Sequence, residues 1–296
     1  MPDFYATSGA TPLDQADGLR RMFAGRSTQL LCLVANPHVS FSGLVLDRIA
    51  GGLAAWGRRV LVVDAAASSP PPHELAQIDL SACLELIGPR TVYLPARGLP
   101  MQYVDTRGCA SSFIDTLQRI APQVDVILLH AEAQDLARVL KRRPERPMLL
   151  AADQPDSLKH AYASCKLLVQ RCGLMTYDLL LAASAHSPRV GAIAASLSDC
   201  ADQFLQAVLQ HHALVDPAFD PSEPLDAALA ALLQAQLSTR DSSAPGALTA
   251  EHSLAARQHA AREVTPSWAE ADDSAGMHGG MPIGPSSMTL NRTVLI

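Results

Sequence analysis

The sequence predicts an α/β fold in which a doubly wound, mostly parallel sheet carries helices on both faces. Between residues 29 and 215, short apolar runs alternate with stretches of helical periodicity. Most of these runs are continuously apolar rather than alternating, as expected for strands that are covered on both faces. Hydrophobic residues make up 48% of the 296 residues, which is enough for a sizeable core.

Six apolar runs are the expected strands, and helical stretches lie between them. The strands are expected at 30–35, 59–65, 91–96, 124–131, 147–152 and 177–183. The helices are expected at 43–56, 73–86, 111–121, 132–142, 156–172 and 198–212. Because a helix follows almost every strand, neighbouring strands are expected to run parallel.

Composition divides the chain into four segments. These are 1–28 with an N-terminal helix, 29–215 as the α/β domain, 216–239 as a linker with an amphipathic helix at 225–237, and 240–296 as a mostly disordered tail. The tail is rich in Ser, Gly, Pro and Ala and shows little periodicity, a composition that does not support a packed core.

A helix is predicted over 13–23, "LDQADGLRRMF", ahead of the first strand. Asp14 is a suitable N-cap, and Arg20 and Arg21 lie near the C-terminal end, where cations favour a helix. One face is apolar and holds Ala16, Leu19, Met22 and Phe23. Such a stripe usually packs on the protein's own core, so composition alone favours a helix that caps its own domain.

Charge and composition exclude several classes of function. The net charge of −6 gives no support for nucleic-acid binding through bulk electrostatics. No apolar run approaches the roughly 20 residues of a membrane span, and no secretory signal is visible at the N-terminus. Six scattered cysteines without a CxxC pair are typical of a reduced cytosolic protein.

Three segments resemble the MinD/ParA-type P-loop ATPases. "IAGGLAAWGRRVLVVDA" (49–65) is similar to their "NLAxALAxxGxxVLLxDxD" segment. "QVDVILLHA" (123–131) stands at their second acidic strand, and "PDSLKHAYASCKLL" (155–168) resembles their "PxxxxDAYxxIKxL" helix. The resemblance covers about residues 29–210 and implies the MinD-like P-loop fold.

The family's phosphate loop, "GKGGVGKT", falls on "NPHVSFSG" (36–43) when the spacing is counted back from Gly57. The loop positions are Asn36, Pro37, His38, Val39, Ser40, Phe41, Ser42 and Gly43. Pro37 replaces the signature lysine, and Ser42 replaces the P-loop lysine. Phe41 replaces a glycine, and Gly43 replaces the Mg²⁺-binding hydroxyl residue. Inward-pointing backbone N–H groups, a lysine and a hydroxyl are what this loop needs to hold phosphate, and none is at its place.

Positions outside the loop depart from the family pattern as well. Asp64 is kept, but Ala66 replaces the second aspartate of "DxD". His130 replaces the metal-linked aspartate, and Ala182 replaces the asparagine that contacts adenine. The resemblance therefore implies a pseudo-ATPase with no catalytic residue of its own, no bound cofactor and no metal. The helix N-terminus near Gly43 keeps its dipole, which leaves a weak anion site open.

The N-terminal helix resembles one branch of that family, the FlhG/FleN flagellar number regulators. Members of this branch carry "DQAxxLR" just before the first strand, and "DQADGLR" (14–20) matches it. The resemblance implies that this helix binds and stimulates FlhF, a GTPase of the signal-recognition type. Gln15 would help position the attacking water, and Asp14, Ala16, Leu19 and Arg20 would fix the helix on its partner.

Two alternatives to a GTPase regulator stay open. One is a divergent MinD-like ATPase with nucleotide-dependent dimerisation, in which ATP and Mg²⁺ would bind. The other is a binding scaffold for flagellar or transcriptional components. The expected location is the cytoplasm, with recruitment to the inner membrane or flagellar pole through the partner. The helix at 225–237 contains no Lys or Arg, which favours packing or partner contact over membrane binding.

Two weaker signals remain. His130 and the pair His211–His212 lack Cys or carboxylate residues at ligand spacing, so no metal site is expected there. The basic loop "KRRPER" (141–146) is read as a solvated turn after a helix, with a site for an anionic partner as the less favoured interpretation.

Overall fold

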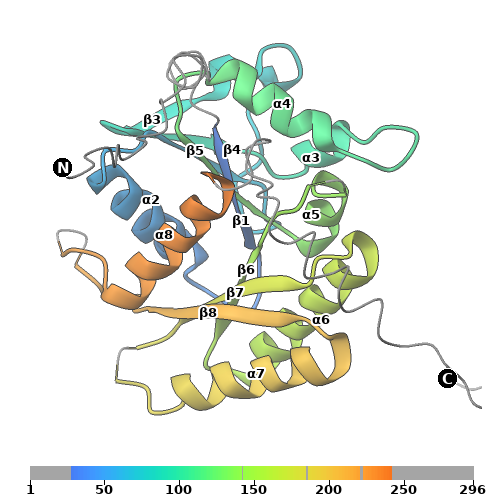
Figure 1. Ribbon diagram of the computed structural model, residues 1–296. Coiled ribbons are helices and arrows are strands. Elements are labelled where there is room, and N and C mark those ends of the chain that lie inside the picture. Colours follow the sequence, from blue (N-terminus) through green and yellow to red (C-terminus); the bar gives the residue numbers. More distant parts are fainter. Residues whose placement is uncertain (1–27, 142, 185, 221–222, 242–296) are drawn as a thin grey trace, which may run out of the picture. The chain divides into compact units, whose positions relative to one another are not determined.

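The computed structural model describes residues 28–141, 143–184, 186–220 and 223–241 (Figure 1). The helix predicted over 13–23, with all the residues expected to contact a partner, lies outside the described residues. So does the predicted tail from residue 242 onwards. The described residues confirm the predicted α/β fold.

One sheet of eight strands runs through this part of the chain in the order β3-β4-β2-β5-β1-β6-β7-β8. The strands are β1 (Gln29–Val34), β2 (Val60–Asp64), β3 (Glu85–Gly88), β4 (Thr91–Pro95), β5 (Val126–Ala131), β6 (Met148–Ala152), β7 (Thr176–Ala182) and β8 (Val208–Val215). All neighbours pair in parallel except β3 and β4, which are antiparallel. The prediction of a mostly parallel sheet is therefore confirmed.

Helices cover both faces of the sheet (Figure 1). They are α2 (Ser42–Ala55), α3 (Leu99–Gln102), α4 (Ser111–Ile120), α5 (Ala133–Val139), α6 (Pro155–Cys172), α7 (Val190–Leu205) and α8 (Ala227–Asp241), with short 3₁₀ helices η1 (Glu74–Gln77) and η2 (Leu80–Cys83). Helices α2 and α8 share one apolar core with the sheet, and α4 to α7 share the other. Along β1, Leu31 and Leu33 face α2 while Leu30 and Cys32 face the opposite layer, because side chains alternate along a strand.

The segment 73–86 was expected to be one helix and is not. It forms η1, η2 and the start of the edge strand β3. The Asp79 carboxylate accepts hydrogen bonds from both the backbone N–H and the hydroxyl of Ser81, and His73 Nδ1 accepts one from the Leu75 N–H. Such local bonds from side chain to backbone compete with a continuous helix.

The helix expected over 198–212 is also wrong in its bounds. Helix α7 begins earlier, at Val190, and ends at Leu205, and the rest of the segment enters β8. Gln206 ends the helix in the left-handed conformation, with φ of 55°, and its N–H donates to the Asp202 carbonyl. Left-handed residues often end helices, but glycine is the usual choice, so no glycine marks this end in the sequence.

The helix expected over 225–237 is present as α8, and its apolar face packs on the sheet. Leu229, Leu232, Leu233 and Leu237 are buried in the core that α8 shares with α2. The Gln29 side chain at the start of β1 donates to the Leu237 carbonyl at 2.8 Å. Among the described helices, none is both long and apolar enough to cross a bilayer.

Candidate functional site at the carboxyl ends of β1, β2 and β5

The loop between β1 and α2 carries the residues that the sequence places at the phosphate loop. Strand β1 lies between β5 and β6, and helix α2 leaves from its carboxyl end. In open α/β sheets, ligands bind at the carboxyl ends of the strands, where the strand order reverses direction. The chain therefore has the right scaffold for a nucleotide site, and the residues at this edge decide what it can hold.

Asn36 closes the loop against the sheet. Its side chain is 4% exposed, and its amide donates to the Leu150 carbonyl at 2.8 Å. The same amide lies 2.9 Å from the Ser157 carbonyl and 3.0 Å from the Ser157 hydroxyl oxygen. The loop is thus tied to β6 and to the first turn of α6. The Ser157 hydroxyl oxygen also accepts from the Ala152 N–H at 2.8 Å.

Two backbone N–H groups of the loop point at Asn36 rather than outward. The His38 N–H donates to the Asn36 side-chain oxygen at 3.1 Å, and the Val39 N–H donates to the Asn36 carbonyl at 3.0 Å. No residue from 36 to 43 has positive φ, so the loop lacks the left-handed turns that glycines bring to a phosphate cradle. Helix α2 follows Phe41, which provides no side-chain cap.

Asp64 and His130 form a buried pair beside this loop. They lie opposite each other on β2 and β5, and both face the α2 side of the sheet. His130 Nδ1 lies 2.8 Å from Asp64 Oδ1, and the imidazole is 1% exposed. Its Nε2 has no hydrogen-bond partner among the described residues. The resemblance implies a metal-linked aspartate at the position of His130, whereas here an imidazole stands there and contacts the Asp64 carboxylate.

Tyr93 and Ala66 complete the surroundings of Asp64. The Tyr93 hydroxyl lies 3.5 Å from Asp64 Oδ2, and the Ala66 N–H lies 3.4 Å from Asp64 Oδ1. Burial raises the pKa of Tyr93, and the Asp64 carboxylate adds to this increase, so the phenol stays protonated and able to donate. The Asp64 oxygens are therefore engaged by protein groups.

Ala182 lies apart from that pair, in a cleft of about 280 Å³ on the other side of the loop. His38, Val39, Ser40 and Phe41 line this cleft together with Ala182. Asp153 also lines it, and its carboxylate accepts a hydrogen bond from the Ser187 hydroxyl at 2.8 Å. No Asn, Lys or Arg side chain is among the described residues that line the cleft, so neither the family's adenine-binding asparagine nor a lysine for phosphate is on its walls.

The structure brings the predicted loop positions, Asp64, His130 and Ala182 to the carboxyl ends of the parallel strands. Sequence reasoning missed Ser157, whose hydroxyl fastens Asn36, and Asp153, which pairs with Ser187. The available signal was weak: both residues lie in "ADQPDS" (152–157), which was interpreted only as the start of a helix. The N-terminal residues expected to contact a partner lie outside the described residues.

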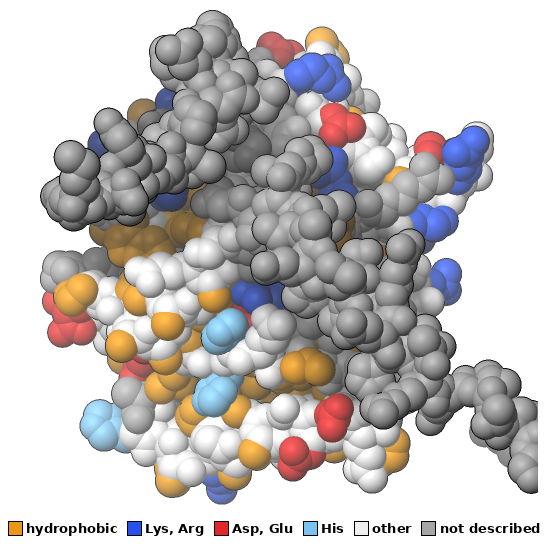
Figure 2. Space-filling model, in the orientation of Figure 1, with side chains coloured by type: hydrophobic (Ala, Val, Ile, Leu, Met, Phe, Trp, Pro, Cys, Tyr) orange, Lys and Arg blue, Asp and Glu red, His pale blue; other side chains and the backbone are white. Residues whose placement is uncertain are grey.

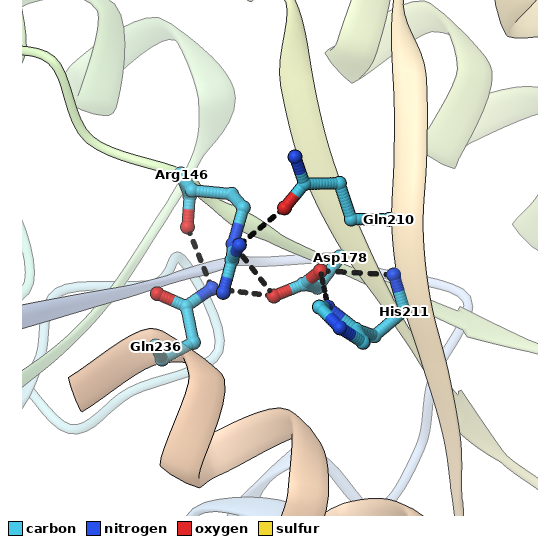
Figure 3. A network of polar contacts seen from close by, with 5 residues as sticks. All are labelled: Arg146, Asp178, Gln210, His211 and Gln236. Atoms are coloured by element: carbon cyan, nitrogen blue, oxygen red, sulfur yellow. Dashed lines mark hydrogen bonds and ion pairs between the residues drawn. The ribbon is translucent and has the colours of Figure 1, made fainter. Parts of the chain in front are cut away.

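A second polar cluster lies at the opposite, amino end of β7 (Figure 3). Asp178 is fully buried, and its Oδ2 lies 3.0 Å from Arg146 Nε. Gln236 of α8 donates to the same oxygen at 2.8 Å. His211 of β8 contacts Oδ1 twice, through its N–H and its ring, both at 3.1 Å. The network joins β7, β8 and α8 and involves no residue of the loop after β1.

This network corrects the interpretation of the basic loop. Arg146 was expected to lie in a solvated turn, but its side chain is 10% exposed and also donates to Gln210. A signal was present in "YDLLLAA" (177–183), because a carboxylate inside a buried strand needs a partner. His211 pairs with that carboxylate rather than standing alone.

One curated relative matches the chain in sequence. The antiactivator FleN of Pseudomonas aeruginosa is 31% identical over 188 residues, which span 55% of this chain and 64% of FleN. The match therefore covers less than two thirds of that relative's own length. No protein-family model matches the chain.

Solved structures share the fold at low sequence identity. A protein assigned to plasmid partition in Borrelia burgdorferi, bound to AMPPNP, aligns with a TM-score of 0.50 at 9% identity, over 72% of this chain and 99% of that one. MinD of Aquifex aeolicus aligns with a TM-score of 0.48 at 13% identity, over 70% of this chain and 97% of that one. The order of the parallel strands and the alignment with the plasmid partition protein show that the chain has that protein's α/β fold, and over the aligned residues its sequence is similar to that of FleN.

Proposed function

We propose that this chain regulates flagellar number or assembly by stimulating an FlhF-type GTPase through its N-terminal helix. The observation that carries the flagellar part is the similarity to FleN over 188 residues. The match of "DQADGLR" (14–20) to the docking helix of that branch supports the choice of partner. The chain then acts in the cytoplasm and reaches the flagellar pole through its partner.

The second part of the proposal is that the chain works without hydrolysing ATP. Phosphate binding needs free backbone N–H groups, a lysine and a hydroxyl for Mg²⁺. Asn36 takes two of the loop's N–H groups, and Ser42 stands where the lysine would be. His130 stands at the position of the family's metal-linked aspartate, and its Nδ1 lies 2.8 Å from Asp64 Oδ1. These contacts favour a role for the α/β domain in presenting the predicted N-terminal helix to a partner rather than in hydrolysing ATP.

The test is GTP hydrolysis by a purified FlhF-type GTPase with and without the full chain. We expect stimulation by the chain and by a peptide of residues 1–26 alone, because the proposed activating groups all lie on that segment. The Gln15→Ala change should remove stimulation but leave binding largely intact, since the amide acts on water in the partner's site. Gln203→Ala, an exposed glutamine on α7, serves as the matched control.

The Leu19→Ala change should instead weaken binding, by about 1–3 kcal/mol, the usual scale for an apolar anchor at an interface. Binding is measured separately from hydrolysis, so the two roles can be told apart. Full stimulation by the Gln15→Ala chain would show that the glutamine has no catalytic part. If the chain had no effect on the rate of GTP hydrolysis, the whole proposal would be wrong.

A further inference from the structure

A cleft on the face opposite α2 is lined by cations that the flagellar proposal does not use. Its volume is about 500 Å³, and it lies between α5, α6 and the loop that precedes α4. Arg107, Arg138, Lys141 and Arg171 line it, and no carboxylate is among its described lining residues. Figure 2 shows Lys and Arg side chains gathered at the margin of the molecule beside these elements. The chain as a whole carries a net charge of −6, so this cleft has the opposite sign.

Favourable interaction with a helix dipole explains the positions of only two of these four basic residues. Arg138 lies in the last turn of α5 and Arg171 in the last turn of α6, where cations are favourable. Arg107 comes from a loop, and Lys141 follows α5, so neither belongs to a last turn. The Lys141 ammonium donates to the Arg107 carbonyl at 2.8 Å, which joins the two walls of the cleft. The cluster is therefore assembled from three separate elements.

Acidic neighbours compensate two of the four charges. Asp135 pairs with Arg138 at 3.3 Å. Asp105 stands near Arg107 and Lys141; backbone N–H donation from Cys109 lowers the pKa of its carboxyl, and the two cations add to this decrease. The Arg171 guanidinium makes no ion pair or hydrogen bond with any described residue. A sphere with the volume of the cleft is about 10 Å across, comparable to the Debye length in 0.1 M salt, so solvent ions screen the remaining repulsion only in part.

We propose that this cleft binds a small molecule carrying two or more phosphate groups. Guanidinium groups match phosphate oxygens with two parallel hydrogen bonds, and three of the four cations are arginines. The volume lies within the range of small-ligand sites, about 300–1,000 Å³. The other lining residues are Gly108, Gln134, Ala137 and Leu167, of which only Gln134 has a polar side chain. A multivalent anion here relieves the repulsion among the cations.

The experiment is calorimetric titration of the full chain with inorganic tripolyphosphate in a low-salt buffer. We expect binding that weakens as salt is added. Arg171→Gln and Arg107→Gln should each weaken it about tenfold, the scale of one charge-assisted hydrogen bond. Neither guanidinium group forms a hydrogen bond or close ion pair with a described residue, and the Asp105 carboxylate near Arg107 belongs to an exposed loop, so folding should be unchanged. Arg119→Gln removes an equal charge from an exposed position on α4, outside the cleft. It is the matched control and is expected to change binding less than twofold.

Three results would overturn the proposal. The first is the absence of tripolyphosphate binding to the unaltered chain. The second is an equal loss of affinity in Arg119→Gln, which would mean diffuse attraction by surface charge only. The third is tighter binding of hexaglutamate than of tripolyphosphate, which would make the cleft a docking surface for acidic peptides. The titration uses this chain alone, so its outcome is independent of any effect on a GTPase.

Discussion

Asp178 shows how one residue can hold three elements together. A carboxylate without any exposure is tolerated only when its oxygens are paired, and here Arg146, His211 and Gln236 all contact it. The partners come from the segment before β6, from β8 and from α8. The carboxylate therefore links α8 to the sheet in addition to the apolar contacts of that helix.

Asp178→Ala should lower the free energy of unfolding by about 3–5 kcal/mol, because it leaves Arg146 buried without its partner. The measurement is urea denaturation followed by circular dichroism. Asp156→Ala is the matched control: it breaks an ion pair with Lys159 whose side chains are 69% and 76% exposed, and should change stability by less than about 1 kcal/mol. Similar losses in the two variants would mean that the buried network does not support the fold.

Ser42 and its neighbours lead to a prediction about nucleotide. The loop after β1 should not bind Mg-ATP at millimolar concentration, because no lysine neutralises the phosphates and the Asn36 contacts occupy loop N–H groups. The calorimetric titration uses the double variant Arg107→Gln, Arg171→Gln, in which phosphate binding by the cationic cleft is weakened. An active P-loop ATPase of the same fold, titrated identically, shows that the assay can detect binding. A micromolar Mg-ATP isotherm with that double variant would contradict this prediction.

Sequence reasoning identified the positions of the candidate site but not the contacts that close it. The resemblance to the MinD/ParA-type ATPases placed residues 36–43 by their spacing to Gly57, and it also singled out Asp64 and His130. The bond from Asn36 to Ser157 spans 121 positions, and the bond from Gln236 to Asp178 spans 58. Such partners depend on tertiary packing, which spacing along the chain does not encode.

At the scale of elements, buried parallel strands were the most predictable part of the fold. Continuous apolar runs such as 124–131 have few alternatives to a covered strand. The edges of the sheet were missed, because β3 and β8 have side chains exposed to solvent and lack that signal. The helices predicted over 73–86 and 198–212 follow from good helix formers in those segments. In the structure, the local bonds of Asp79 interrupt the first segment, and the left-handed Gln206 ends the helix in the second.

Two neighbouring glycines in α2 test its packing. A Cβ at Gly51 would meet open space, so Gly51→Ala should raise the free energy of unfolding by about 1 kcal/mol through helix propensity. A Cβ at Gly52 would lie 2.6 Å from Leu225 Cγ, so Gly52→Ala should lower it by about 1–3 kcal/mol. Thermal and urea denaturation of both variants measure the difference. Equal stabilisation by the two changes would mean that Leu225 does not pack against α2.

At the scale of the whole molecule, the loop after β1 bears on assembly. The resemblance implies a dimer that forms around nucleotide and depends on the lysine at the position of Pro37. We therefore expect Mg-ATP to leave the mass of the chain in solution unchanged, as measured by light scattering. The same measurement without nucleotide is the reference. An ATP-dependent shift from monomer to dimer would support the alternative of a divergent ATPase.

The contact between Gln29 and the Leu237 carbonyl links residues 208 positions apart, and this has a consequence for biosynthesis. At roughly 5–20 residues per second, a ribosome needs roughly 10–40 s to make the intervening chain. The sheet face that α8 later covers is complete in sequence only at the end of β8, at Val215, and α8 ends 26 residues later, at Asp241. Leu150, Leu180 and Ala213 therefore wait roughly 1–5 s for the helix that covers them. The apolar side chains of that face become buried only after nearly the whole described chain has been translated. Until then they are exposed to chaperones that bind nascent chains.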